Sequence, residues 1–192
     1  MKLITKRVTA TLASTLITGC VFKEPYPKQW ADIYLTPGDC PDISGVFNDE
    51  GRLDPKEVGE VGEGWLKRSL SRLLLTDKDK IETVSHVEIN QLENGGIKVT
   101  AWNENKPVTE QRFSKRNGDF TCKTGFVEFV GEKVCETGNG IMACATPETD
   151  LIKNNEGALI VKTNSRGFGA VYLIPVYVSE WHWYRFLPLT IN

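Results

Sequence analysis

The chain has few of the residues and none of the short motifs that mark common catalytic sites. Its 192 residues include only two histidines, His86 and His182. It contains no Gly-x-Ser-x-Gly elbow, no His-Glu-x-x-His zinc motif, no phosphate-binding loop and no Gly-x-Gly-x-x-Gly motif. A Ser-His-Asp arrangement would have to use one of the two histidines. We therefore predict a protein that is not an enzyme and that holds no cofactor and no metal.

Long uncharged runs and an excess of basic residues are also missing. The longest uncharged run near the C-terminal end, residues 167–179, has 13 residues, whereas a membrane-spanning helix needs about 20. Without residues 1–19 the chain carries 20 basic and 25 acidic residues, a net charge of −5. Nucleic-acid binding requires a clustered basic face, so we expect no nucleic-acid partner.

The first 20 residues have the pattern of an export signal. Three basic residues precede residues 8–18, which are uncharged but too short to span a bilayer. Gly19 then comes directly before Cys20. A basic start, an uncharged run and a small residue before cysteine together resemble a bacterial lipoprotein signal peptide that ends in a lipobox. The body is similar to that of small envelope lipoproteins.

The resemblance implies cleavage before Cys20, lipid on its thiol and an acyl chain on its new amino terminus. The membrane would then be a partner through lipidated Cys20. Each buried methylene contributes about 0.8 kcal/mol and one chain alone binds marginally, so several chains imply stable attachment. A residue other than Asp after the cysteine favours the outer membrane, and Val21 fits. The alternative is that Cys20 is an ordinary thiol and residues 8–18 form a core segment.

Four further cysteines remain when Cys20 is set aside. An even number in an oxidising compartment predicts two disulfides, and four cysteines allow three pairings. We expect Cys135 to pair with Cys144, because residues 138–140 (Gly-Asn-Gly) can turn the chain back, and Cys40 to pair with Cys122. A zinc site is the competing interpretation, but no Cys-x-x-Cys pair supports it.

The pattern predicts three parts: a signal peptide (residues 1–19), a lipidated flexible tether (20–38) and one β-rich domain (39–192). The tether is expected from its prolines and charged residues. One helix is expected from Trp65 to about Thr76, because leucines recur there at helical spacing.

Strand patterns dominate the rest of the chain. Alternating segments around Asn94-Gly95 predict a hairpin, and further strands are expected from their composition and alternation. The expected strands are residues 43–47, 86–90, 97–102, 108–113, 120–130, 158–163, 170–178 and 181–187. This predicts a mainly β fold: an antiparallel meander that forms a curled sheet, a sandwich or a partly open barrel, with one helix.

The densest aromatic cluster lies at residues 181–186. In a strand, Trp181, Trp183 and Arg185 would share one face, where two indoles beside a guanidinium could bind a sugar or the polar end of an acyl chain. The alternative is that one face fills the core and the other covers the sheet. We predict an envelope lipoprotein that binds or scaffolds another envelope component, such as an envelope protein. A lipocalin-like carrier of a small apolar ligand is the second hypothesis.

Overall fold

The computed structural model describes residues 19–23, 25–35, 40–52, 67–77, 79, 81, 83–123, 125–131, 133–138, 141–171 and 174–189. Residues 1–18 of the expected signal peptide therefore lie outside the described residues. The elements are β1 (Gly19–Lys23), β2 (Gly45–Asn48), β3 (Glu50–Arg52), β4 (Lys67–Ser69), α1 (Leu70–Leu74), β5 (His86–Gln91), β6 (Gly96–Asn103), β7 (Lys106–Ser114), β8 (Thr121–Lys123), β9 (Phe126–Val130), β10 (Val134–Gly138), β11 (Ile141–Lys153), β12 (Leu159–Val171) and β13 (Ile174–Phe186).

The described strands form two sheets. The larger has nine strands in the order β4-β3-β13-β12-β11-β9-β8, with β1 beside β13 and β10 beside β11; the smaller has the order β2-β5-β6-β7. Neighbouring strands are antiparallel except for β1, which runs parallel to β13. The mainly β prediction is confirmed, and the pairing of the described strands does not close either sheet into a barrel.

The main core lies between the two sheets. The inward residues of the alternating strands fill it, as the period-2 pattern predicts. Phe47 and Ile89 come from the smaller sheet, while Leu151 and Phe186 come from the larger one, and all four are fully buried. Leu70 of α1 covers one end of this core. The expected hairpin is also present, with Gly95 at φ 74° in the turn between β5 and β6.

The helix is shorter than the leucine spacing predicts. Strand β4 occupies Lys67–Ser69, and α1 has only five residues before it ends at Leu74. The Ser69 hydroxyl caps the helix by accepting from the Arg72 backbone N–H, at 3.1 Å. Pairing of β4 with β3 takes the residues that the helical pattern would otherwise use. Trp65 lies outside the described residues.

The C-terminal strands are longer than expected. The sequence predicts separate strands at residues 158–163, 170–178 and 181–187, with breaks at 164–169 and 179–180, but β12 and β13 each run unbroken for 13 residues. A Cβ on Gly169 would collide with the Met142 carbonyl of β11, so this glycine permits close strand approach and does not end the strand.

Part of the expected tether packs against the protein. Residues 25–33 cross the outer face of the larger sheet, where Trp30 is buried beside Phe126, Ile152 and Ile160. A backbone hydrogen bond from Asn155 to the Asp32 carbonyl, at 3.3 Å, also holds this segment. The structure differs here from a free tether because aromatic side chains between the prolines provide apolar surface to bury.

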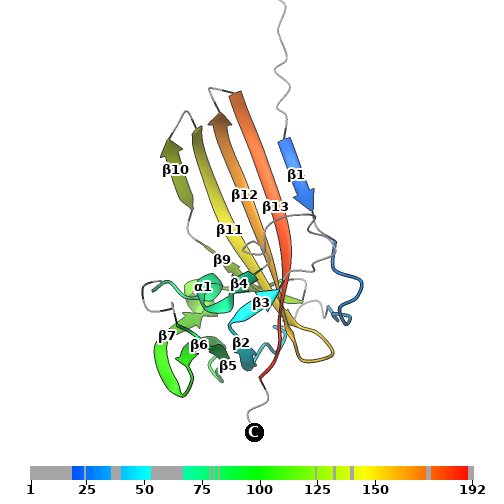
Figure 1. Cartoon of the computed structure of the whole chain (residues 1–192), viewed down its shortest axis with the longest axis vertical. Helices are drawn as coiled ribbons and strands as arrows, with labels where there is room; N and C mark the ends of the chain where they lie inside the picture. The colour runs from blue at the N-terminus through cyan, green and yellow to red at the C-terminus, as the bar shows by residue number, and fades with distance from the viewer. Residues whose placement is uncertain are drawn as a thin grey trace, which may run out of the picture.

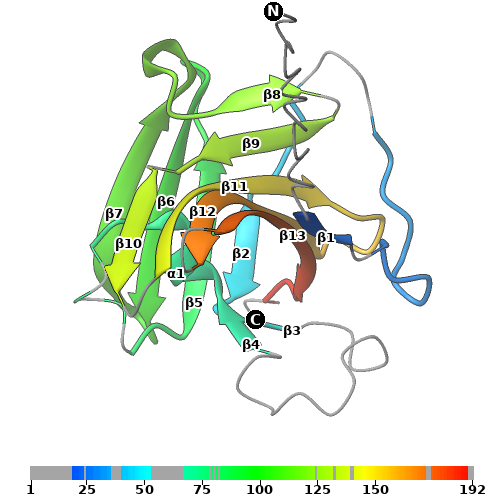
Figure 2. The ribbon, with the colours of Figure 1, turned by 90° about the horizontal axis from the view of Figure 1, so that it is seen from above.

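Three strands extend well beyond the body. Figure 1 shows β11, β12 and β13 running past the smaller sheet, with β10 along one side and β1 along the other. The view from above in Figure 2 shows the smaller sheet curling round to face the larger one. We define the β arm as residues 141–147, 165–171 and 174–180 of these three strands.

Both expected cysteine pairs are present as disulfides. Cys40 joins Cys122 with Cα atoms 5.0 Å apart, and Cys135 joins Cys144 with Cα atoms 4.0 Å apart. The first links the start of the domain to β8, and the second fastens β10 to β11 in the arm. A cysteine sulfur in a disulfide is not a thiolate, so these four cysteines do not act as zinc ligands in this state.

The two disulfides should differ in their contribution to stability. They close loops with sequence separations of 82 and 9 residues. Chain-entropy arguments then give roughly 4 to 5 kcal/mol for the longer loop and roughly 2.5 to 3 kcal/mol for the shorter one. We expect the Cys40→Ser, Cys122→Ser double variant to lose more unfolding free energy in urea than the Cys135→Ser, Cys144→Ser variant. The reverse order would contradict the prediction.

Candidate functional site

The aromatic cluster of β13 divides between the two faces of the larger sheet. Tyr184 and Phe186 are buried in the main core. Trp181, Trp183 and Arg185 lie on the outer face, in register with Asn164, Lys162 and Ile160 of β12. The structure therefore confirms the expected alternation along this strand.

The outer-face indoles are engaged by the protein itself. The Lys162 ammonium lies 4.4 Å from the Trp181 ring centroid and 5.8 Å from that of Trp183. Tyr26, from the segment that crosses this face, makes an edge contact with Trp183 at 5.2 Å. Indoles that a lysine and a tyrosine of the same chain already contact offer less surface to a sugar. These contacts favour the structural interpretation of the pair.

Charged residues next to the indoles form a paired network on the outer face. Lys162 donates to the Asp150 carboxylate at 3.1 Å, and both side chains are mostly buried. Asn164 donates to Glu148 at 2.8 Å, and Arg166 lies 3.4 Å from the same carboxylate. Burial raises the pKa of the Asp150 carboxyl above its ordinary value, although the charge and hydrogen bond of Lys162 oppose this.

Each histidine has a structural neighbour. His86 stacks on Trp102, with ring centroids 6.0 Å apart, and its Nδ1 lies 2.9 Å from the Ser85 hydroxyl. That hydroxyl also donates to the Trp102 carbonyl and accepts from the Glu104 N–H, so it holds the β6–β7 turn in place. His182 lies 3.8 Å from Glu180, whose side chain is about half exposed.

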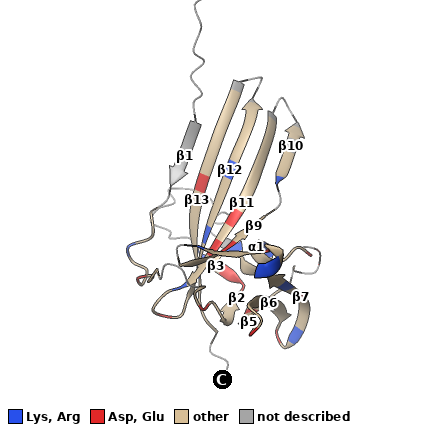
Figure 3. Cartoon of the chain, turned by 180° about the vertical axis from the view of Figure 1, so that it is seen from behind, with Lys and Arg blue, Asp and Glu red and all other residues tan. Residues whose placement is uncertain are grey.

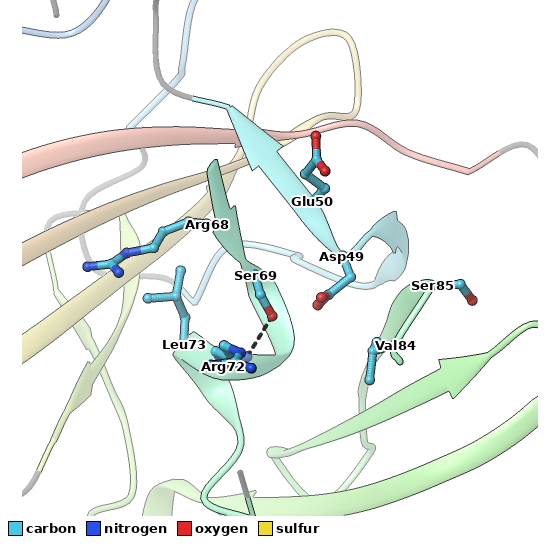
Figure 4. Close-up of a pocket in the computed structure, with 8 residues that line it drawn as sticks. All are labelled: Asp49, Glu50, Arg68, Ser69, Arg72, Leu73, Val84 and Ser85. Carbon is cyan, nitrogen blue, oxygen red and sulfur yellow. Dashed lines mark hydrogen bonds between the residues drawn. The ribbon is translucent and has the colours of Figure 1, made fainter. Parts of the chain in front are cut away.

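An open groove of about 740 Å³ lies between β3, α1 and the start of β5. Figure 4 shows its lining residues, which are Asp49, Glu50, Arg68, Ser69, Arg72, Leu73, Val84 and Ser85. Four of these carry charge, and Asp49 is used to accept the Ser71 backbone N–H at 2.7 Å. A charged groove of this kind does not match the apolar cup that a lipocalin-like carrier requires.

The β arm is the feature that the sequence patterns did not identify. Residues 141–147, 167–171 and 174–179 contain no Asp, Glu, Lys or Arg; we call them the charge-free end. In Figure 3 the charged residues of β11, β12 and β13 lie towards the body and not towards the tip. The sequence signal that could have indicated the arm was a pair of uncharged runs, residues 137–147 and 167–179. Their significance depends on the pairing that places them side by side.

Large apolar side chains are exposed on both faces of the arm. Met142 and Phe168 on the outer face are 59% and 61% exposed. Val178, on the inner face, is 38% exposed, and Val134 of the adjoining β10 is 54% exposed. Exposed apolar patches of this kind mark interaction surfaces in folded proteins.

Cys20 lies beside the arm. Strand β1 pairs with β13 so that Cys20 is opposite Val178 in the charge-free end. Among the described residues, no helix has the length and apolar composition that crossing a bilayer requires. The described residues also include no group of three or more His, Cys, Asp and Glu side chains arranged to hold a metal ion.

Comparison of the chain with protein-family models, with curated proteins and with solved structures finds no match.

The carboxyl groups of Asp150 and Asp42 should change the free energy of unfolding in opposite directions as the pH changes. The folded state raises the pKa of Asp150 above 3.8 by burial, so it binds the proton more tightly than the unfolded chain does. We expect the difference in unfolding free energy, wild type minus Asp150→Asn, to fall as pH rises from 3.8 through the raised pKa. Urea denaturation at a series of pH values measures it.

Asp42 provides the matched control. Burial alone would raise its pKa, but hydrogen bonds from Lys153 and Ser44 outweigh burial and lower it below 3.8. The corresponding difference for Asp42→Asn should therefore fall as pH drops below 3.8 towards the lowered pKa. Equal slopes for the two variants would contradict these assignments.

Proposed function

We propose that the protein is a lipid-anchored, non-enzymatic component of the bacterial cell envelope, held at the outer membrane through Cys20. Its β arm binds another envelope component. The leader that ends at Gly19-Cys20 supports the proposed location in the cell envelope. The single observation that carries the binding role is the charge-free end, which is exposed on both faces and lies beside Cys20.

The arm is suited to binding because it is already ordered. Backbone pairing fixes all three of its strands, and the Cys135–Cys144 disulfide fastens β10 along one side. A surface that is ordered before binding loses little conformational entropy when a partner covers it. Fully buried residues of the body, such as Leu151 and Val99, pack in one cluster between the sheets, and the groove of about 740 Å³ on the body is lined by four charged residues; both features favour a scaffold over a carrier of an apolar ligand.

Replacing Cys20 tests the anchor. We expect Cys20→Ser to lose its lipid mass and to leave the membrane fraction, because no acyl chain would hold it there. The matched control is Leu187→Ser, at an exposed position beyond the body end of β13, which should keep both lipid and membrane location. A Cys20→Ser protein that still sediments with membranes, with no loss of lipid mass, would show that the anchor is wrong.

Met142 tests the arm as a contact surface. It is the only methionine once residues 1–19 are removed, and it is 59% exposed in the isolated fold. A free arm should let peroxide oxidise it at nearly the rate of the urea-unfolded chain. We expect oxidation, followed as sulfoxide by mass spectrometry, to be several-fold slower in isolated envelopes. Equal rates would refute a bound arm.

A further inference from the structure

We propose that the charge-free end of the β arm enters one leaflet of the bilayer that holds the lipid on Cys20. This inference rests on the proposed lipid anchor and identifies the envelope component that the arm contacts as the lipid itself. It follows from four properties of the arm: its charge boundary, its length, its two apolar faces and the position of Cys20.

A sharp charge boundary crosses the arm. Glu180 is in register with Ser165, Arg166 with Ser179, and Glu148 with Asn164, so the three charges lie on consecutive rungs of the β11–β12–β13 ladder. From this level to the tip, the three strands carry no charge (Figure 3). A boundary between charged and uncharged surface at one level is expected where headgroups meet hydrocarbon.

The length of the charge-free end matches one leaflet. Residues 141–147 extend about 20 Å at roughly 3.3 Å per residue. The hydrocarbon core is about 30 Å thick, so one leaflet contributes about 15 Å, and a spanning strand needs about 9 to 11 residues. The end is therefore long enough to enter a leaflet obliquely and too short to cross the bilayer.

Both faces of the arm are apolar, which favours lipid over a protein partner. Met142 and Phe168 are exposed on the outer face, while Val178 is exposed on the inner face. A docked protein typically covers one face and leaves the other in water, whereas lipid surrounds an inserted element on both sides. Burial of both faces gains about 25 cal/mol for each Å² of apolar surface.

The anchor lies at the level of the charge boundary. Cys20 is opposite Val178, and Val178 is one residue from Ser179, which is in register with Arg166. The acylated residue of a lipoprotein lies where headgroups meet acyl chains. Trp181 is three residues further towards the body, at the depth where interfacial tryptophans are enriched. These features place the bilayer surface at one level along the arm.

The edges of the sheet set its tilt. Backbone groups on a free edge find no partner in hydrocarbon, which limits insertion to a shallow depth. Strand β10 covers the edge of β11, and it carries one acidic residue, Glu136, opposite Ala143. An acidic residue at this register position, three residues nearer the tip than the rung of Arg166, requires the β10 side to stay near the headgroups if the β12 and β13 side enters the leaflet. The arm therefore enters obliquely, with its β12 and β13 side deeper.

Photo-crosslinking in intact envelopes tests this inference. We would replace Phe168 and, separately, Met142 with p-benzoylphenylalanine in the full chain and irradiate the cells. Both positions are exposed, so the bulky ring can be accommodated without repacking the core. The matched control is the same substitution at Leu187, which is 46% exposed and follows the other end of β13. Mass spectrometry identifies the adducts.

We expect phospholipid adducts at positions 168 and 142 to be several-fold more abundant than at position 187. Adducts with a second copy of the chain or with another protein would overturn the inference, as would lipid adducts no more abundant than at the control position. The intact mass of the same samples reports acylation of Cys20. Acylated protein without lipid adducts refutes the inference alone, whereas an unmodified Cys20 refutes the proposed function as well.

Discussion

The continuous ladder of β11, β12 and β13 is the constraint on which the rest of the structure depends. Its pairing advances one residue at a time for 13 residues, so alternate residues of each strand share one face of the sheet along its whole length. Near the body, Leu151, Val161 and Tyr184 use that face to complete the main core. The same register continues past the smaller sheet, where Met142, Phe168 and Val178 are exposed, and this extension is the arm.

The arm persists as a sheet because pairing overrides local preference. Gly167 and Gly169 would normally weaken a strand, but β11 and β13 hydrogen-bond to β12 on both sides. The Met142 carbonyl lies where a Cβ on Gly169 would be, so the glycine is required by the close approach of β11. The disulfide between Cys135 and Cys144 adds a covalent constraint along the β10 side.

The charged residues of β11, β12 and β13 all lie on the body side of the ladder, and this distribution bears on both stability and the proposed role. Close to the body, Lys162 pairs with Asp150 and Arg166 with Glu148, so these charges have compensating partners. Towards the tip, β11, β12 and β13 themselves carry no charge in residues 141–147, 167–171 and 174–179. Stable pairing in the body and an uncharged exposed end suit a domain that stays folded in water while its arm lies in a less polar environment. The proposed anchor at Cys20 is at the transition between them.

The sequence alone determined the features that depend on local pattern. Alternation predicted the strands of the smaller sheet, parts of β12 and β13 and the two faces of residues 181–186, but no strand was expected where β10 and β11 lie. Asn94-Gly95 predicted a hairpin, the Gly-Asn-Gly turn predicted the Cys135–Cys144 pair, and Cys40–Cys122 was the pair that remained; the hairpin and both disulfides appear in the structure. The leader indicated the proposed anchor by its own chemistry. Each of these signals lies within a short stretch of chain or in a simple count.

Only the tertiary structure decided the length of the final strands, the short helix and the arm. The leucine spacing after Trp65 predicted a helix where β4 pairs with β3, and residues 164–169, which lay between two expected strands, are part of β12. The two uncharged runs, residues 137–147 and 167–179, did not predict a surface when each was considered separately. They became one exposed surface because strand pairing, which acts between distant parts of the chain, placed them side by side beyond the reach of the smaller sheet.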